Sequence, residues 1–223
     1  MAGAKVEKMH VNQFAPYDEL AGNLLLVGQT AEDGAHDTSH LERVWRNAKA
    51  IQETEGGDLE LIAASVLLHD CVQVPKNSSL RKMASRLAAT EARTLLAALN
   101  WEIDRIQKVA EAIESHSYSA GITPKTLEGR ILQDADRLDA IGLTGIARCF
   151  YTAGRMGSAL YDSRDPRGES RPLDDLRFAL DHFPKKLLTL VDSFNTAAGQ
   201  RLAQNRQRVL QDFYDGMLAE VSF

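Results

Sequence analysis

Apolar residues recur at intervals of three and four along almost the whole chain, whereas alternation of apolar and polar residues over a strand length is scarce. An interval of three or four places apolar side chains on one face of an α-helix. The pattern predicts helices over part of 17–26, from 40 past 51, over 59–70, 80–99 and 103–117, from about 127, through 150, and from 184 onward. The sequence therefore predicts an all-α fold.

Start and stop signals bound two of these helices. Ser39 and Glu42 form a capping box, which predicts a helix that begins at His40. Gly56–Gly57 should end that helix, because glycine is a poor helix former. Asp58 follows at once, and its side chain is of the type that caps a helix N-terminus. The sequence thus predicts a sharp junction between two helices at 56–58.

The helix predicted over 59–70 is apolar on nearly every side between residues 61 and 68. A helix of that kind lies in the core of a protein. It should therefore deliver His69 and Asp70, at its C-terminal end, into a buried or cleft position. A buried carboxylate with no cation adjacent in sequence is costly unless a partner is supplied, and a metal ion is one such partner.

Two histidines and two acids follow the order His40, His69, Asp70 and Asp136 along the chain. Imidazole and carboxylate form a mixed nitrogen and oxygen ligand set that suits divalent metals. Two of each can hold one ion while coordination positions stay open for water. Each residue alone also fits a structural histidine or a solvated ion pair, so the hypothesis rests on their combination.

The helix predicted from about residue 127 carries acids on more than one face. At 100° per residue, Gln133, Asp136 and Asp139 fall together on a face that differs from the apolar one. Asp134 points elsewhere. This geometry groups Asp136 with Asp139 and separates it from Asp134.

Composition narrows the class of partner. The 223 residues carry a formal net charge of -5, which gives no general attraction to nucleic acid or to an anionic membrane. An anionic substrate must therefore be drawn in by local cations or a metal. The N-terminus lacks an apolar signal core, the apolar runs are too short to span a bilayer, and two cysteines make no disulfide framework. We expect a cytoplasmic protein without a membrane or nucleic-acid partner.

These motifs together resemble the HD superfamily of metal-dependent phosphohydrolases. The stretches that carry the resemblance are Ser39-His-Leu-Glu-Arg-Val44, Val66-Leu-Leu-His-Asp70 and Asp134-Ala-Asp-Arg-Leu-Asp139. Two further stretches, Arg171-Pro-Leu-Asp-Asp175 and Ala179-Leu-Asp-His-Phe183, are similar to the small stand-alone bacterial hydrolases of the YedJ and YpgQ type. The resemblance covers roughly residues 35 to 215.

The resemblance implies an HD-domain helical bundle with additional C-terminal helices. It predicts a single domain over 1–223, with a core at about 35–155 and a C-terminal extension at about 172–223. The implied metal ligands are His40, His69, Asp70 and Asp136. Asp136 is preferred because the family's ligand is the acid just before a basic residue and a leucine. We expect one divalent ion (Mn, Mg, Co, Ni, Fe or Zn), with Mn favoured.

Further site residues are implied around these ligands. Asp70 and His116 are the catalytic candidates, because a ligand carboxylate has a second oxygen that can accept a proton from water. Lys76, Arg137 and Asp139 are the candidates for substrate binding, and a guanidinium suits phosphate because its nitrogens bind oxygens in pairs. The alternatives are a capping histidine at 116, a solvated lysine at 76 and a salt bridge of Arg137 to Asp134 or Glu128.

The resemblance also covers Asp181, His182 and Lys185, for which we favour a structural role near the helix that starts at Pro184.

The predicted function is metal-dependent hydrolysis of a small nucleotide by attack of an activated water on phosphorus. Cleavage of a nucleoside triphosphate to monophosphate and pyrophosphate is the favoured version. The alternatives are a phosphodiesterase, a guanosine polyphosphate hydrolase, a di-iron oxygenase, and a non-catalytic module that binds a nucleotide or a protein. The sequence leaves the base, the attacked phosphorus and the oligomeric state open, a homodimer included.

Overall fold

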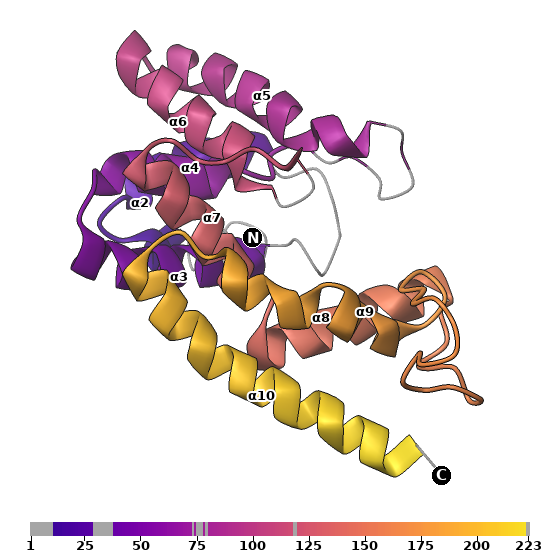
Figure 1. The fold of residues 1–223 in the computed structure, drawn as a ribbon. Helices are drawn as coiled ribbons and strands as arrows, with labels where there is room; N and C mark the ends of the chain where they lie inside the picture. Colours follow the sequence, from indigo (N-terminus) through magenta and orange to yellow (C-terminus); the bar gives the residue numbers. More distant parts are fainter. Residues whose placement is uncertain are drawn as a thin grey trace. The chain divides into compact units, whose positions relative to one another are not determined.

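The computed structural model describes residues 11–28, 38–72, 74, 78, 80–117 and 120–221, and these are mainly helical (Figure 1). The helices of ten or more residues are α2 (Asp18–Gly28), α3 (Thr38–Glu55), α4 (Leu59–Leu68), α5 (Ala84–Ala98), α6 (Ile103–His116), α7 (Leu127–Asp139), α8 (Gly142–Met156) and α10 (Ala197–Val221). The shorter ones are η1 (Asn12–Phe14), η2 (Arg81–Met83), η4 (Ala179–Asp181), α9 (His182–Lys185) and η5 (Leu187–Ser193). Over the described residues, the only β-type pairing is an isolated bridge between Ala159 and Phe178. The predicted all-α fold is confirmed.

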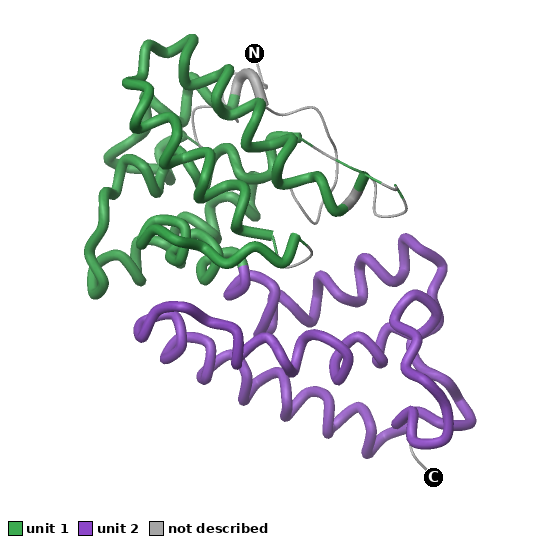
Figure 2. The backbone as a smooth tube through the Cα atoms, turned by 45° about the horizontal axis from the view of Figure 1, so that its top comes forward, with its two compact units in different colours: residues 1–136 green, residues 137–223 purple. Residues whose placement is uncertain are grey.

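The chain divides into two compact units, unit 1 (Met1–Asp136) and unit 2 (Arg137–Phe223), which Figure 2 colours separately. The division falls inside α7, directly after Asp136. The sequence has no linker at this point, since α7 is continuous across it. None of the helices in the described ranges combines the length and the apolar character that a bilayer span requires.

The core of unit 1 is built around α4. Every residue from 61 to 68 is buried, as predicted for a helix that is apolar on all sides. The helix packs against α2, α3 and α6, and α6 in turn forms a helical hairpin with α5 (Figure 1). Because α4 ends at Leu68, it places His69 and Asp70 directly at the edge of this core.

The junction before α4 forms as the sequence predicts. Gly56 and Gly57 end α3 with φ angles of 80° and 97°, which side chains rarely adopt. The Asp58 carboxylate accepts hydrogen bonds from the backbone N–H groups of Glu60 and Leu61, at 3.0 and 3.1 Å. Arg105 of α6 also donates to Asp58, at 2.8 Å. The predicted cap is confirmed.

The predicted start of α3 is wrong by two residues. The helix begins at Thr38, so Ser39 lies inside its first turn and is not the capping residue. A capping box identifies a favourable start, but the helix extends as far as the backbone keeps helical angles. His40 consequently lies in the first turn of α3, where it is 1% exposed.

The apolar face of α7 is completely buried. Its members are Ile131, Leu132, Ala135 and Leu138, each with 0% exposure. Asp134 is also fully buried, whereas the Asp136 side chain is 28% exposed. The predicted separation of the two acids therefore corresponds to different surroundings on the helix.

Unit 2 has its own core between α8, η5 and α10. The ring of Phe183 stacks on Phe213 and on Tyr214, with centroid distances of 5.6 and 5.7 Å. Phe150 of α8 approaches Phe183 at 6.1 Å. The long helix α10 runs beside α8 (Figure 1). Aromatic packing thus joins three elements of this unit.

Hydrogen bonds and ion pairs hold the segment before α9 in place. The buried carboxylate of Asp181 accepts hydrogen bonds from Arg171, at 2.9 Å to Oδ1, and from the backbone N–H of Asp174 at 2.7 Å. His182 and Lys185 both contact Asp175. These contacts support the structural role that we favour for Asp181, His182 and Lys185.

Candidate metal centre

Four helices of unit 1 bring histidines and acids to one place. His40 comes from the first turn of α3, and His69 and Asp70 directly follow α4. His116 is the last residue of α6, and Asp136 lies on α7. These five residues are all in unit 1, although 96 positions separate the first from the last in the sequence (136 − 40).

The potential ligand atoms converge. His40 Nε2 lies 3.2 Å from His69 Nε2, 3.6 Å from Asp136 Oδ1 and 3.8 Å from Asp70 Oδ2. The distance between His69 Nε2 and Asp70 Oδ2 is 3.6 Å. His116 Nε2 lies 3.9 Å from the other carboxylate oxygen of Asp70. Two overlapping groups result, His40 with His69 and Asp136, and His69 with Asp70 and His116.

The distances from His40 fit ligands that share one divalent ion. Ligand atoms about 2.1 Å from one ion can lie at most about 4.2 Å apart. Nε2 of His40 lies 3.2 to 3.8 Å from an atom of each of His69, Asp70 and Asp136. Asp70 and Asp136 fall in different groups, so one ion held by all four residues would draw these two carboxylates closer together. Imidazole and carboxylate are also the donor types that bind Mn, Fe, Co, Ni and Zn. The residues present therefore fit a divalent metal.

Backbone carbonyls orient two of the histidines. Nδ1 of His69 lies 2.8 Å from the carbonyl oxygen of Val66, and Nδ1 of His116 lies 2.6 Å from that of Ile113. Because a carbonyl oxygen only accepts, Nδ1 must carry the proton in both rings. In each neutral ring Nε2 then has a free lone pair that faces the cluster. This is the tautomer that binds a metal through Nε2.

The contact between His40 and His69 fits either a hydrogen bond donated by His40 or a cation held by both rings. The His69 lone pair at Nε2 faces His40 Nε2 at 3.2 Å. Two nitrogen lone pairs at this distance repel each other unless a proton or a metal cation lies between them. The approach of the two rings is therefore consistent with a cation site.

Helix ends and burial set the electrostatics of this cluster. His69 and His116 both stand at C-terminal helix ends, where the partial negative charge favours a cation. Burial lowers the pKa of His116, and the neighbouring His69 lowers it further, against the opposing charges of Asp70 and Asp136. His116 is therefore neutral at pH 7.

The carboxylates form the open side of the cluster. The side chains of His40 and His69 are 1% and 0% exposed, whereas those of Asp70 and Asp136 are 37% and 28% exposed. Among the described residues, the carboxylates are therefore the part of the cluster that is most exposed. The imidazoles provide the buried, rigid side of the site.

The other sequence candidates are not in these two groups. In unit 2, the Asp139 side chain is 1% exposed and pairs with Arg148 at 2.7 Å. Arg137 donates to the backbone carbonyl of Ser193, and Glu128 accepts from the backbone N–H of Asp58. Lys76 lies outside the described residues. Among the secondary candidates that the structure describes, His116 is the one that joins these groups.

Asn47 is a buried polar residue beside the site that the sequence analysis does not single out. It is 6% exposed, and its amide donates to the carbonyl of Ala135 at 3.0 Å. The sequence did contain a signal. Asn47 stands three residues after Val44 and four before Ile51, on the apolar face of α3, where a polar residue needs a partner.

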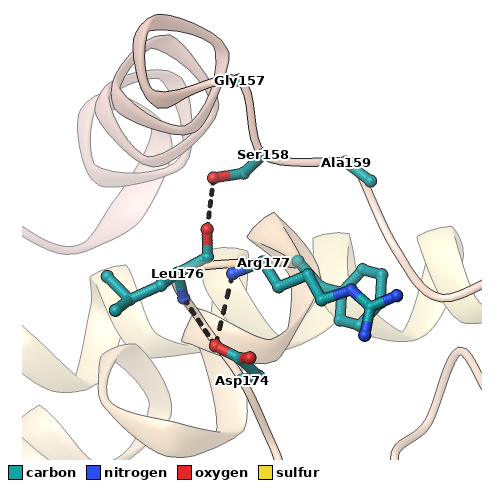
Figure 3. Close-up of a pocket in the computed structure, with 7 residues that line it drawn as sticks. Gly157, Ser158, Ala159, Asp174, Leu176 and Arg177 are labelled. Carbon is teal, nitrogen blue, oxygen red and sulfur yellow. Dashed lines mark hydrogen bonds between the residues drawn. The ribbon is translucent and has the colours of Figure 1, made fainter.

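Unit 2 has a surface hollow of about 570 Å³ at the end of α8 (Figure 3). Its walls are Gly157, Ser158, Ala159, Asp174, Leu176, Arg177 and Phe178. Ser158 donates to the carbonyl of Leu176 at 2.6 Å, and Asp174 accepts from the backbone N–H groups of Leu176 and Arg177 (Figure 3). None of the predicted site residues lines this hollow.

Comparison with known proteins connects the cluster to a family. The HD domain family matches residues 38–141, a range that includes His40, His69, Asp70, His116 and Asp136. The uncharacterized protein YpgQ of Bacillus subtilis (strain 168) is 33% identical over 188 residues, which cover 82% of this chain and 83% of YpgQ.

Solved structures agree with this result. The crystal structure of Bacillus subtilis YpgQ in complex with ADP is similar with a TM-score of 0.69 and 30% identity, over 90% of this chain and 96% of YpgQ. An HD-superfamily hydrolase from Bacillus thuringiensis has a TM-score of 0.67 and 30% identity, over 91% of this chain and 96% of its own. The similarity extends through both units.

Proposed function

Because this chain belongs to the HD superfamily, we propose that it is a metal-dependent phosphohydrolase that acts on a small nucleotide. The reaction we favour is the cleavage of a nucleoside triphosphate to monophosphate and pyrophosphate. Membership of the superfamily and similarity to an HD-superfamily hydrolase support the general class of reaction. The choice of nucleotide rests on the observations given next.

The observation that carries the proposal is the convergence of His40, His69, Asp70 and Asp136 in one partly open cluster. We assign these four residues as the ligands of one divalent ion, with Mn favoured. When bound, such an ion supplies Lewis acidity toward phosphoryl oxygens and makes water more acidic. The buried imidazoles hold the site rigid, and the exposed carboxylates face the solvent.

Asp70 and His116 are suited to proton transfer. One oxygen of Asp70 faces His40 and His69, while Oδ1 faces His116 Nε2 at 3.9 Å. Asp70 Oδ1 is the oxygen that we assign to accept a proton from the attacking water. His116 is neutral and has its lone pair at Nε2, so it can take that proton onward. We assign these two atoms as the proton acceptors.

A nucleotide is the substrate class that the comparison supports. YpgQ, 30% identical in this alignment, was crystallised in complex with ADP. A divalent ion neutralises phosphate oxygens, which an acidic protein needs if it is to bind an anion. We keep Lys76, Arg137 and Asp139 as proposed substrate contacts, although Asp139 already pairs with Arg148 and Arg137 already donates to Ser193.

The test is a substrate panel with a matched pair of variants. Nucleoside triphosphates and phosphomonoesters are incubated with the protein and Mn²⁺, Mg²⁺ or Co²⁺, and pyrophosphate and phosphate are measured separately. We expect pyrophosphate from triphosphates, dependent on the metal. Asp70→Ala should lose both metal retention and turnover. Asp104→Ala removes an exposed acid of the same unit and should leave both unchanged.

Different outcomes select different functions. Release of phosphate alone from monoesters would replace the pyrophosphohydrolase with a phosphomonoesterase. Full activity of Asp70→Ala would contradict the assigned site. A protein that retains metal and releases neither product would instead be a binding module.

A further inference from the structure

Two buried side-chain amides tie α7 to neighbouring helices. The amide of Asn47, on α3, donates to the carbonyl of Ala135 at 3.0 Å. The amide of Gln133, on α7 itself, donates to the carbonyl of Ser115 at 2.7 Å, in the last turn of α6. Asn47 and Gln133 are 6% and 3% exposed. Both hydrogen bonds lie inside unit 1 and away from solvent.

Each bond ends next to a residue of the metal centre. Ala135 directly precedes Asp136, and Ser115 directly precedes His116. Asn47 lies seven residues after His40 on the same helix, which is two helical turns. The two amides therefore connect the helices that carry His40, Asp136 and His116.

We propose that Asn47 and Gln133, here called the amide clamp, are positioning residues that hold Asp136 at its distance from His40 and His116. The role is distinct from that of the ligands, because both amide nitrogens donate to backbone carbonyls. The inference rests on the proposed function through the metal site alone and does not depend on the substrate.

The geometry explains why α7 needs a clamp. Asp136 is the ligand that α7 supplies, and its Oδ1 must lie close to His40 Nε2, at 3.6 Å. A shift or rotation of α7 would move the carboxylate and leave the α3 and α4 ligands in place. Asn47 blocks such a shift from the α3 side, and Gln133 blocks it from the α6 side. Partners behind the ligands of a metal commonly act in this way.

The same contacts could serve folding alone, so stability must be separated from positioning. The amide of Gln52 on α3 donates to the carbonyl of Gly57 in a solvent-exposed hydrogen bond at 3.2 Å. It offers the same chemical group on the same helix as Asn47, and its acceptor lies near the start of α7, at the opposite end of that helix from Asp136. Ile106 on α6 is 4% exposed and lies at the opposite end of that helix from His116. Its truncation weakens the core and leaves the clamp intact.

The experiment compares Asn47→Leu and Gln133→Met, which remove the donors at similar volume, with Gln52→Met and Ile106→Val. For each full-length protein we measure the Mn²⁺ dissociation constant, from free Mn²⁺ by electron paramagnetic resonance, and Tm without metal. Each clamp variant should raise the dissociation constant by about 10-fold or more. Gln52→Met and Ile106→Val should keep it within about twofold, even where Ile106→Val lowers Tm.

Clamp variants that lose Tm as Ile106→Val does but keep the wild-type Mn²⁺ affinity would overturn the proposal and leave the amides a purely structural role. The two variants lie on different helices, so a failure of one to fold leaves the other as the test. A wild-type protein that binds Mn²⁺ but hydrolyses no nucleotide would remove the proposed function. The affinity comparison would still decide whether the clamp positions Asp136.

Discussion

At the scale of single residues, the backbone decides what the histidines can bind. The Nδ1–H groups of His69 and His116 donate to the carbonyls of Val66 and Ile113, so the Nε2 atom of each neutral ring offers a lone pair to a metal. Each carbonyl lies three residues before its histidine at a helix end, where carbonyls lack helical partners. The ligand character of these rings therefore follows from where α4 and α6 end.

The sequence predicts which histidines and acids lie together better than it predicts the contacts of the residues around them. The sequence predicts His40, His69, Asp70 and Asp136 as one set, and Nε2 of His40 lies within 3.8 Å of an atom of each of the other three. Their role as metal ligands stays a prediction. The helical-face argument also grouped Asp139 with Asp136. The angle around a helix does not show which neighbouring residues contact each side chain. Asp139 is buried in an ion pair with Arg148 and is not in either metal-binding group.

His116 should affect turnover more than metal binding. It lies outside the group formed by His40, His69 and Asp136, and it faces Asp70 Oδ1. His116→Ala should lower kcat by about 100-fold or more, because a proton acceptor is lost. Its Mn²⁺ dissociation constant should stay within about threefold of the wild type. Steady-state kinetics and metal titration measure the two quantities, and a variant that loses metal affinity to the extent of His69→Ala would instead make His116 a ligand.

At the scale of helices, the sequence predicts an end correctly where a local residue determines it, such as a capping side chain or a glycine. Asp58 caps α4 and two glycines end α3, as the sequence indicates. The predicted start of α3 is two residues too late, because Ser39, the residue that the capping pattern places before the helix, lies inside it. The amide clamp could not be predicted, because it depends on which helices lie beside α7.

Removal of the α4 cap should destabilise unit 1. Asp58→Ala leaves the N–H groups of Glu60 and Leu61 without their acceptor and should cost about 1 to 2 kcal/mol in the free energy of unfolding. Asp58→Asn keeps a capping oxygen and should lose less than about 1 kcal/mol, mainly the pair with Arg105. Denaturant unfolding compares the two variants, and an equal loss in both would show that the charge, and not the cap, carries the effect.

The same residue gives a defined pH dependence. Burial alone would raise the pKa of Asp58, but hydrogen bonds from Arg105 and from the backbone outweigh it and hold the pKa below its usual value. The charged form then stabilises the fold above the unfolded pKa of about 3.9, and this contribution is lost as the pH falls through the folded pKa. The stability difference between wild type and Asp58→Asn should therefore shrink from pH 6 to pH 3. A stability difference that stayed constant from pH 6 to pH 3 would contradict the lowered pKa of Asp58.

Two glycines of α8 should respond in opposite directions to alanine. A Cβ on Gly145 would lie 2.2 Å from the carbonyl oxygen of Ala140, whereas one on Gly154 meets nothing within 4 Å. Gly145→Ala should lower the free energy of unfolding by about 1 to 3 kcal/mol. Gly154→Ala should raise it by up to about 1 kcal/mol, because alanine favours the helix. Denaturant unfolding tests both, and a neutral Gly145→Ala would show that the joint before α8 can shift.

At the scale of the whole molecule, the all-α fold is confirmed and the division into units is new. The HD domain match runs over 38–141 and so continues past Asp136, where the two units divide. The sequence could not predict this division, because it falls inside α7, which is one continuous helix with no linker. The predicted single domain with its C-terminal extension stays a prediction. The cluster itself belongs to unit 1.

Metal binding should stabilise unit 1 in particular. Mn²⁺ at 100 times its dissociation constant should add about 2.7 kcal/mol to the free energy of unfolding. Hydrogen exchange should show the largest added protection in α3, α4 and α7, which supply the proposed ligands. Removal of the metal with a chelator should reverse both the added stability and the added protection. Protection that appeared only in α8 and α10 would place the metal elsewhere.

The most direct test of the account is hydrolysis of a nucleoside triphosphate in ¹⁸O-labelled water by the Mn²⁺-loaded protein, with the products separated and weighed by mass spectrometry. We predict nucleoside monophosphate and pyrophosphate, with one ¹⁸O atom in only one of them, and no products from Asp70→Ala. The labelled product identifies the attacked phosphorus. An intact triphosphate in the presence of a protein that carries one Mn²⁺ at His40, His69, Asp70 and Asp136 would contradict the proposed hydrolysis.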